Sequence, residues 1–177
     1  PDAEAEVKAD RRYDLVLLGL IPIQLAAVGL LLWVAATGRL TGWSLLGAVG
    51  DVGILCGTIG INVGHELGHR REKRNQRLAQ LLLLTTHYMH FFIEHNRGHH
   101  ARVATEEDPA SARAGEGLYA FWIRSIVNSW RNAWSLEARR MAAQGRATWS
   151  PRNQMLQFQA IQITALAAVV AVAGPLA

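Results

Sequence analysis

The sequence predicts an all-α integral membrane protein: a helical bundle with about three spanning helices and a cytoplasmic helical cap that carries histidine-rich segments. Hydrophobic residues make up 50% of the 177 residues, and they gather in long runs instead of alternating as they do in strands. Five of the seven histidines fall into two short groups beside those runs. We therefore expect residues 1–177 to belong to one membrane domain with a histidine-rich site.

Three apolar runs are long enough for a spanning helix, which needs about 20 residues. They predict spans over about residues 15–36, 43–64 and 156–177. The second run is rich in glycine, which favours close packing between helices. Ser150-Pro151, just ahead of the third run, is typical of an N-cap followed by the first turn of a helix.

The basic residues predict how the chain is oriented in the membrane. Of the 18 Lys and Arg residues, fourteen lie between Arg70 and Arg152, three precede the first run, and Arg39 lies in the turn after it. Lys and Arg concentrate on the cytoplasmic side of membrane proteins. We therefore expect a multi-pass inner-membrane protein, in contact with lipid, whose N-terminus and region 65–152 are cytoplasmic. This topology accounts for the net charge of +4, so we expect no nucleic-acid partner.

The stretch Leu78–Ile93 is apolar but short for a spanning helix. If it crossed the membrane, the histidine groups on its two sides would be separated by most of the ~30 Å hydrocarbon thickness. We expect a helix that lies against the membrane or among the other helices on the cytoplasmic side. Further along, Asp108-Pro109 looks like the start of a helix.

A second cytoplasmic helix is predicted from Leu118 onward. Trp122, Ile126, Trp130 and Trp134 recur there at every fourth residue, which is typical of one face of an amphipathic helix. Such a helix suits the membrane interface, but it can also pack on its own domain, and the pattern leaves both open.

The histidine groups have the spacing of metal ligands. His65 and His69 are four residues apart, so both imidazoles project from one helical face. His95 and His99 have the same spacing, and His100 adds a neighbouring direction. Neutral imidazole binds iron, zinc and copper. The two groups therefore predict a metal site.

The number of histidines indicates the kind of metal site. The sequence HELGH at 65–69 fits the pattern of zinc metalloproteases, in which Glu66 would be the general base. A single zinc ion usually takes four ligands, so two metal ions explain five histidines better. An all-imidazole site of this kind in a membrane suits iron and oxygen chemistry. His87 and His90 lie in an apolar helix, where we expect hydrogen-bonded packing residues, although contact with metal stays open.

These motifs resemble those of the membrane alkane hydroxylases, within the wider superfamily of histidine-box di-iron oxygenases and desaturases. The sequence HELGH at 65–69 is similar to the first histidine box of that family, and EHNRGHH at 94–100 is similar to the second. The segments VATEEDPASAR at 103–113 and NAWSLEA at 132–138 also resemble it. The similarity is strong over residues 62–138, whereas the flanking apolar regions match mainly in topology.

The resemblance implies a non-haem centre of two iron ions on the cytoplasmic side of the inner membrane. It implies terminal hydroxylation of medium- to long-chain n-alkanes to primary alcohols, with O2 as co-substrate and electrons from rubredoxin and its reductase. The matching positions imply iron ligands at His65, His69, His95, His99 and His100.

Two further sets of residues are candidates near this centre. Glu66, Glu94 and Asp108 are candidates to accept a hydrogen bond from the second ring nitrogen of the ligating imidazoles. On the helix of the first box, three residues precede His65 by one to three turns on about its face. We expect them to line the substrate channel, and they are Ile54, Thr58 and Ile61.

The sequence also departs from the family pattern. His100 is its last histidine, so the later histidine boxes of the family are missing. The chain opens on the acidic stretch Asp2–Asp10 and ends within an apolar run, and we expect it to be part of a longer protein. We expect the chain alone to bind iron poorly and to be inactive. The alternatives are a zinc intramembrane metalloprotease, a fatty acid desaturase-type di-iron enzyme and an inactive fragment.

Overall fold

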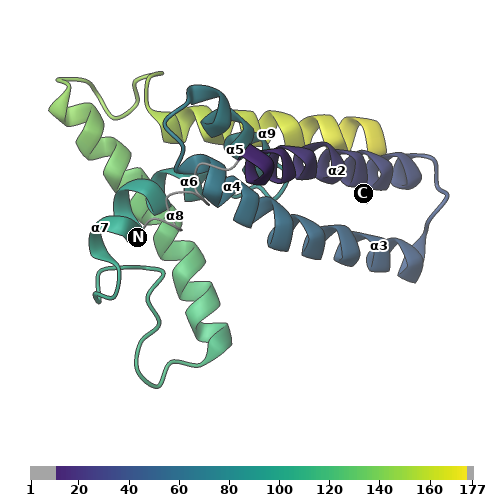
Figure 1. Ribbon diagram of the computed structural model, residues 1–177, viewed down its shortest axis with the longest axis horizontal. Helices are drawn as coiled ribbons and strands as arrows, with labels where there is room; N and C mark the ends of the chain where they lie inside the picture. Colours follow the sequence, from purple (N-terminus) through teal and green to yellow (C-terminus); the bar gives the residue numbers. More distant parts are fainter. Residues whose placement is uncertain (1–10, 175–177) are drawn as a thin grey trace. The chain divides into compact units, whose positions relative to one another are not determined.

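A computed structural model describes residues 11–174, and within that range all regular structure is helical (Figure 1). The all-α prediction is confirmed. The acidic stretch Asp2–Asp10 and the last three residues of the predicted third span lie outside the described residues. In chain order the helices, including the π-helical turns η1 and η2, are α2 (Arg11–Ala36), α3 (Gly42–Leu55), η1 (Cys56–Gly60), α4 (Ile61–Gly68), α5 (Lys73–Leu84), α6 (His90–Glu94), η2 (His95–His99), α7 (His100–Arg102), α8 (Leu118–Ala143) and α9 (Gln154–Ala173).

Three helical segments are long and apolar enough to cross a membrane, as the sequence predicts. They cover Arg12–Ala36, Gly42–Gly68 and Gln154–Ala173. The second runs without interruption through α3, η1 and α4, and it ends one residue before His69. The first histidine box therefore lies at the end of a membrane-length helix.

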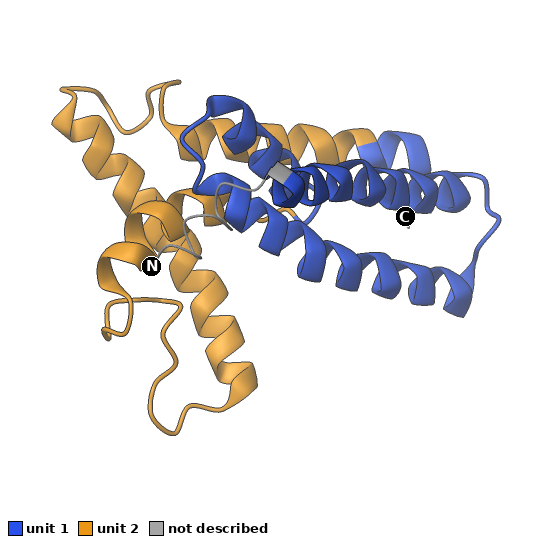
Figure 2. Ribbon diagram, viewed as in Figure 1, with its two compact units in different colours: residues 1–86, 169–177 blue, residues 87–168 orange. Residues whose placement is uncertain are grey.

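The chain divides into two compact units (Figure 2). The first contains residues 1–86 and 169–177, and the second contains residues 87–168. Helix α9 begins in the second unit, and its last turn is grouped with the first.

In the first unit, α2 and α3 form a hairpin of long apolar helices (Figure 1). Gln24 on α2 is completely buried, and its Nε2 donates a hydrogen bond of 2.7 Å to Thr85 Oγ1. Gly60 makes room for this polar side chain, because a Cβ there would run into the Gln24 amide. This interhelical bond satisfies the Nε2 donor of Gln24, whereas its buried Oε1 has no hydrogen-bond partner among the described residues.

Helix α5 packs closely on α4 in the same unit. Ala79, Leu82 and Leu83 of α5 are buried. A Cβ at Gly64 of α4 would lie 3.3 Å from Leu83 Cγ, so the small residue permits the close approach of the two helices. Burying a leucine side chain fully contributes about 1.5–3 kcal/mol, and this contact fixes the helix that carries the first box.

The predicted helix over Leu78–Ile93 is broken in two, so that expectation is wrong in its local structure. Helix α5 ends at Leu84, and α6 begins at His90. The hydroxyls of Thr85 and Thr86 donate back to the carbonyls of Leu82 and Leu83, and His87 has a φ of 52°. A left-handed residue ends an α-helix. Neither piece, of 12 and 5 residues, is long enough to span a bilayer.

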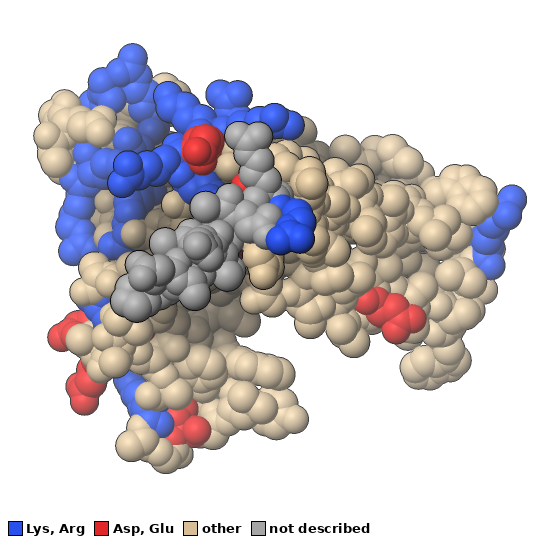
Figure 3. Space-filling model, in the orientation of Figure 1, with Lys and Arg blue, Asp and Glu red and all other residues tan. Residues whose placement is uncertain are grey.

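In the second unit, α6 packs against α8. Ile93 of α6 and Ala133 of α8 are completely buried, and Phe92 meets Phe158 of α9 edge to face. Lys and Arg side chains gather over the C-terminal end of α8 and the loop that follows (Figure 3). The basic residues at the end of α8 and in the loop before α9 therefore form a surface of the second unit.

The amphipathic helix predicted from Leu118 is confirmed as α8. Its buried face consists of Ser129, Ala133, Glu137 and Met141, which are spaced by four residues. The tryptophan face lies elsewhere, and Trp122 and Trp130 are 52% and 41% exposed. The helix therefore packs on its unit through this face, while Trp122 and Trp130 stay largely exposed.

Two predicted helix starts are wrong. Asp108-Pro109 lies in a loop, because the Asp108 carboxylate accepts from the backbone N–H of Ala110 and closes a local turn that no helix continues. The N-cap of α9 is Asn153 rather than Ser150, since Asn153 Oδ1 accepts from the N–H groups of Met155 and Leu156 at 2.8 and 3.3 Å.

The Asn153 cap can be tested by substitution. We expect Asn153→Ala to lower the free energy of unfolding by about 1–2 kcal/mol, because it removes a buried cap together with the hydrogen bond to the Thr148 carbonyl. Ser150→Ala is the matched control and should change stability by less than about 0.5 kcal/mol. Unfolding in mixed detergent, followed by circular dichroism, measures both; equal losses would contradict the assignment.

Candidate metal centre

The first histidine box forms a pair of facing imidazoles at the end of α4. His65 and His69 are one helical turn apart, and their rings meet edge to face with centroids 4.5 Å apart. Their Nε2 atoms lie 3.1 Å from each other. The i,i+4 spacing therefore has the predicted effect, because it brings the Nε2 atoms of the two rings close together.

The second box also forms a facing pair, but with different partners from those that the spacing indicated. His95 Nε2 lies 3.0 Å from His100 Nε2, whereas His95 and His99 stack with ring centroids 5.2 Å apart. The reason is that residues 95–99 form the π-helical turn η2. A π-helix closes hydrogen bonds between residues five apart, so His100 takes the place over His95 that His99 would take in an α-helix.

Both pairs fit a metal ion. Two nitrogen ligands about 2.1 Å from one ion lie about 3.0 Å apart at a right angle and about 3.4 Å apart at the tetrahedral angle. The separations of 3.1 Å in the first box and 3.0 Å in the second match the smaller value. One neutral imidazole can also donate to another at this distance, but two lone pairs facing each other suit a cation. Each box therefore offers two nitrogen atoms at a separation that one metal ion could bridge.

His99 is held by a carboxylate. Its Nδ1 lies 2.9 Å from Oδ2 of Asp108, which is 1% exposed. An acceptor at Nδ1 keeps the proton on that nitrogen and leaves Nε2 as the lone-pair donor. Asp108 thus lies where its predicted role requires.

Asp108 remains ionised because of its own donors. Burial by itself would raise the pKa of Asp108, but hydrogen bonds from Ser111 Oγ, the Ala110 N–H and His99 outweigh it, so that the pKa is lowered. This contribution to stability is present above the pKa of the unfolded chain and is lost as the pH falls through the lower folded value.

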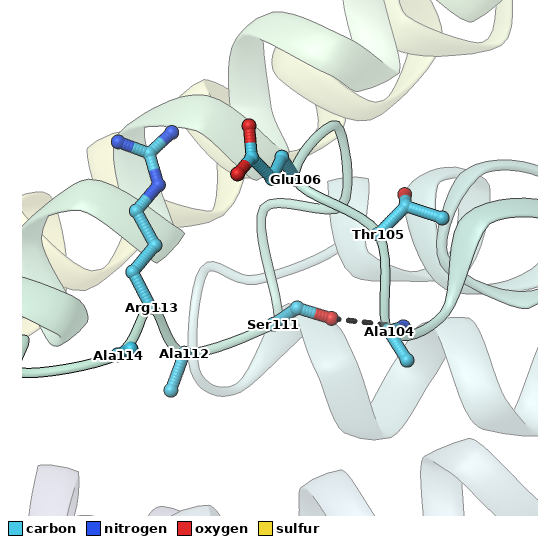
Figure 4. Close-up of a pocket in the computed structure, with 7 residues that line it drawn as sticks. All are labelled: Ala104, Thr105, Glu106, Ser111, Ala112, Arg113 and Ala114. Carbon is cyan, nitrogen blue, oxygen red and sulfur yellow. Dashed lines mark hydrogen bonds between the residues drawn. The ribbon is translucent and has the colours of Figure 1, made fainter.

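The loop that carries Asp108 is shaped around an open pocket of about 610 Å³ (Figure 4). Ser111 connects its two sides, because its hydroxyl donates to Asp108 and accepts from the N–H of Ala104 at 3.1 Å. Ala104 has a φ of 65°, a left-handed conformation that turns the chain out of α7. The loop is irregular, but its hydrogen bonds fix the carboxylate.

Glu94 is the residue immediately before η2, and its side chain supports the second box. It is 2% exposed, and Asn132 Nδ2 of α8 donates to its Oε1 at 2.9 Å. Burial raises the pKa of Glu94, while the hydrogen bond from Asn132 opposes the change. Gly98 lies directly over these groups, since a Cβ there would be 2.5 Å from Glu94 Oε1 and 2.7 Å from Asn132 Nδ2.

Glu66 forms an exposed ion pair. It lies 3.0 Å from Arg70, which also contacts Asp14 of α2 at 3.1 Å. These contacts tie the end of α4 to the start of α2. Exposed pairs of this kind contribute about 0–1 kcal/mol.

The two remaining histidines differ from each other. His87 is exposed at the turn between α5 and α6. His90 is buried against the ring of Tyr88, and burial lowers its pKa to about 4. Within the described part of the chain its Nε2 has no hydrogen-bond partner. His90 is therefore a buried packing residue, as expected, and its hydrogen bond is not formed through Nε2.

The three predicted channel residues lie on both sides of η1. Ile61 is in α4, one turn before His65, and keeps the α-helical register with it. Ile54 lies before the π-turn and is 68% exposed, and Thr58 lies within the turn. Because a π-turn inserts an extra residue, the face of His65 does not continue unchanged to these two positions.

Three polar residues that support the second box were not singled out from the sequence as site residues. They are Asn132, Ser111 and Glu137. The partners of Asn132 and Glu137 are 38 and 40 residues away along the chain, and the contacts of Ser111 are formed by an irregular loop. Periodicity therefore gives no signal for these residues. The signal that existed was the resemblance over 103–113 and 132–138, which contains all three.

The long apolar helices and the two histidine boxes define a helical membrane protein with an imidazole-rich candidate metal centre. The chain belongs to the fatty acid desaturase family, whose profile matches residues 42–177.

Several relatives carry the names of hydroxylating enzymes. The chain is 38% identical over 171 residues to alkane 1-monooxygenase 1 of Alcanivorax borkumensis. The matched region covers 97% of this chain and 42% of that protein. It is 37% identical over 176 residues to alkane 1-monooxygenase of Pseudomonas putida, with coverage of 99% and 44%. It is 27% identical over 158 residues to the xylene/toluene monooxygenase hydroxylase component of Pseudomonas putida, with coverage of 88% and 43%. The resemblance to alkane hydroxylases is confirmed, and the chain spans less than half of the length of these relatives.

The close packing at Gly98 gives a test of the second box. We expect Gly98→Ala to lower the free energy of unfolding by about 1–3 kcal/mol, because the new methyl group meets the buried Glu94 and Asn132 side chains. Gly53→Ala in α3, where a Cβ meets nothing within 4 Å, is the control and should be neutral or stabilising by up to about 1 kcal/mol. Detergent unfolding measures both; a stabilised Gly98→Ala would show that the turn is not packed as described.

Proposed function

We propose that this chain supplies the first two histidine boxes of a di-iron membrane monooxygenase that hydroxylates the terminal carbon of medium- to long-chain n-alkanes. The observation that carries the proposal is the pair of facing Nε2 atoms in each box, at 3.1 and 3.0 Å. The identity of 37–38% to alkane 1-monooxygenases over nearly the whole chain supports the substrate class.

The five histidines would share two iron ions, together with ligands from the remainder of a longer polypeptide. His65 and His69 would hold iron from the first box, and His95, His99 and His100 from the second. Iron supplies the oxidant that an unactivated C–H bond requires. The overall reaction is alkane + O2 + two electrons + two protons to primary alcohol + water, in which one oxygen atom enters the C–H bond and the other leaves as water.

The chain's own residues would hold the imidazoles and exclude competing reactions. Asp108 keeps a proton on Nδ1 of His99, so that Nε2 of His99 would be available to iron as a neutral ligand. Glu94 and Asn132 fix the turn that carries the second box. The apolar membrane helices would deliver the alkane from the lipid phase, because an alkane partitions into the bilayer.

We propose that the boxes face the cytoplasm, since the basic residues concentrate in region 65–152. The electrons would come from rubredoxin with its reductase on that side of the inner membrane. The basic surface at the end of α8 is compatible with an acidic electron carrier, although the same charges follow from the topology.

Metal and product analysis tests the proposed function. We expect the full-length membrane protein to bind two irons and to convert octane to 1-octanol with reduced rubredoxin, and we expect the 177-residue chain alone to load less iron and to be inactive. His95→Ala should remove both iron and activity. A single zinc with peptidase activity would support the protease alternative, and an alkene product would support a desaturase; either result would exclude hydroxylation as the function.

The substrate channel gives a second test. We propose that it begins at Ile61, the channel candidate that keeps register with His65, and that Thr58 and Ile54 contribute less because η1 turns the helix face. Ile61→Trp should shift the preferred alkane to shorter chains, measured as the product profile from a mixture of C6 to C16 alkanes. Ile54→Trp is the matched comparison and should shift it less. An unchanged profile for Ile61→Trp would contradict this placement.

A further inference from the structure

Glu137 is a completely buried carboxylate in the C-terminal half of α8, and it accepts four hydrogen bonds. Its Oε1 accepts from Arg97 Nη1 at 2.6 Å and from Arg140 Nε at 2.8 Å. Its Oε2 accepts from Arg140 Nη2 and from the backbone N–H of Gln154, both at 2.7 Å. Burial alone would raise the pKa of Glu137, but the hydrogen bonds from Arg140, Gln154 and Arg97 outweigh it and lower the pKa. The residue is therefore a buried anion.

Arg97 links this anion to the second histidine box. It lies within η2, between His95 and His99. Its two Nη atoms diverge, and Nη1 donates to Glu137 while Nη2 donates to Gln154 Oε1 at 2.9 Å. A planar guanidinium bound at both ends fixes its own orientation much better than a single ion pair would. The backbone of the π-turn is therefore connected at its middle residue to α8 and to the first residue of α9.

The form of this turn decides which imidazoles face each other. As a π-helix it places His100 over His95, with the Nε2 atoms 3.0 Å apart. As an α-helix the same residues would place His99 there instead and would turn His100 away. Single π-turns within helices are rare and frequently lie at functional sites. Because the π-helical form is uncommon, contacts that hold the extra residue in place are needed to favour it over the α-helix.

We propose that Glu137 is a positioning residue for the metal centre: through Arg97 it holds η2 in the π-helical form that brings His95 and His100 together. The inference rests on the proposed function, because that function assigns the two imidazoles to iron. Glu137 touches neither metal nor substrate in this role, and its influence passes through the Arg97 guanidinium. Gln154 is the third residue of this hydrogen-bond network. Its side-chain oxygen accepts from Arg97, and its backbone N–H donates to Glu137.

A purely structural salt bridge would give a different result from a positioning contact. Removing a structural pair lowers stability but leaves the ligand geometry of the folded protein unchanged. Removing a positioning contact changes how tightly and with what geometry the metal is held, and support of this kind is typically worth about 10–100-fold in metal affinity.

Cobalt(II) in place of iron tests the difference without any measurement of activity. Its visible absorption bands report the ligand geometry, and titration reports affinity. In the full-length membrane protein we expect Glu137→Gln, which keeps the shape but loses the charge, to bind cobalt about 10–100-fold more weakly and with shifted bands. Asp51→Asn is the control for the loss of a carboxylate charge, because Asp51 is exposed on α3 and lies fourteen residues before His65. It should leave both affinity and bands unchanged.

A second variant covers the case in which Glu137→Gln does not fold. Gln154→Ala removes one acceptor of Arg97 and keeps both salt bridges of Glu137, and we expect a smaller loss of affinity with bands shifted in the same direction. Unchanged bands in the folded Glu137→Gln or Gln154→Ala protein would overturn the inference, as would an equal shift in Asp51→Asn. A wild-type protein that binds no cobalt or iron would instead overturn the proposed function, and the positioning role with it.

Discussion

Imidazoles on a helix can share a metal ion only when their nitrogens converge, and helix periodicity decides which pairs do so. In α4 the ordinary turn is enough, because His65 and His69 are four residues apart and their Nε2 atoms meet at 3.1 Å. In the second box the same four-residue spacing gives stacked rings, and the π-turn η2 pairs His95 with His100 instead. The contacts of Glu94, Asp108 and Arg97 all surround this one turn.

The π-turn η1, just before the first box, has a different consequence. It lies within a membrane-length helix and contains Gly60, which faces the buried Gln24 amide of α2. Gln24 in turn donates to Thr85 at the end of α5. A hydrogen bond among apolar helices holds their relative position, because each polar group would otherwise be unpaired in a medium without water. The first box is thus supported by packing in its own unit, through α5 against α4 and through α2 against η1.

The sequence predicts the parts of this protein that depend on local periodicity. Hydropathy was sufficient for the three spans, and the spacing of His65 and His69 was sufficient for their shared face. The π-turns were not predictable, since a pattern built on 3.6 residues per turn has no signal for an inserted residue. Asn132 and Glu137 were missed for another reason. They meet Glu94 and Arg97 at 38 and 40 residues' distance along the chain, and such partners follow from tertiary packing alone.

The three buried carboxylates around the second box differ in their electrostatic effect on the imidazoles. Glu137 is neutralised by two arginines, so it holds structure without lending charge to the imidazoles. Burial raises the pKa of Glu94, which favours the neutral, protonated form of this carboxyl group. Asp108 differs, because its donors are the neutral Ser111 hydroxyl, the Ala110 N–H and His99 itself. Its charge therefore acts on the His99 ring and makes Nε2 a stronger donor to a cation. Of the three buried acids, Asp108 is the one whose negative charge reaches a candidate ligand directly.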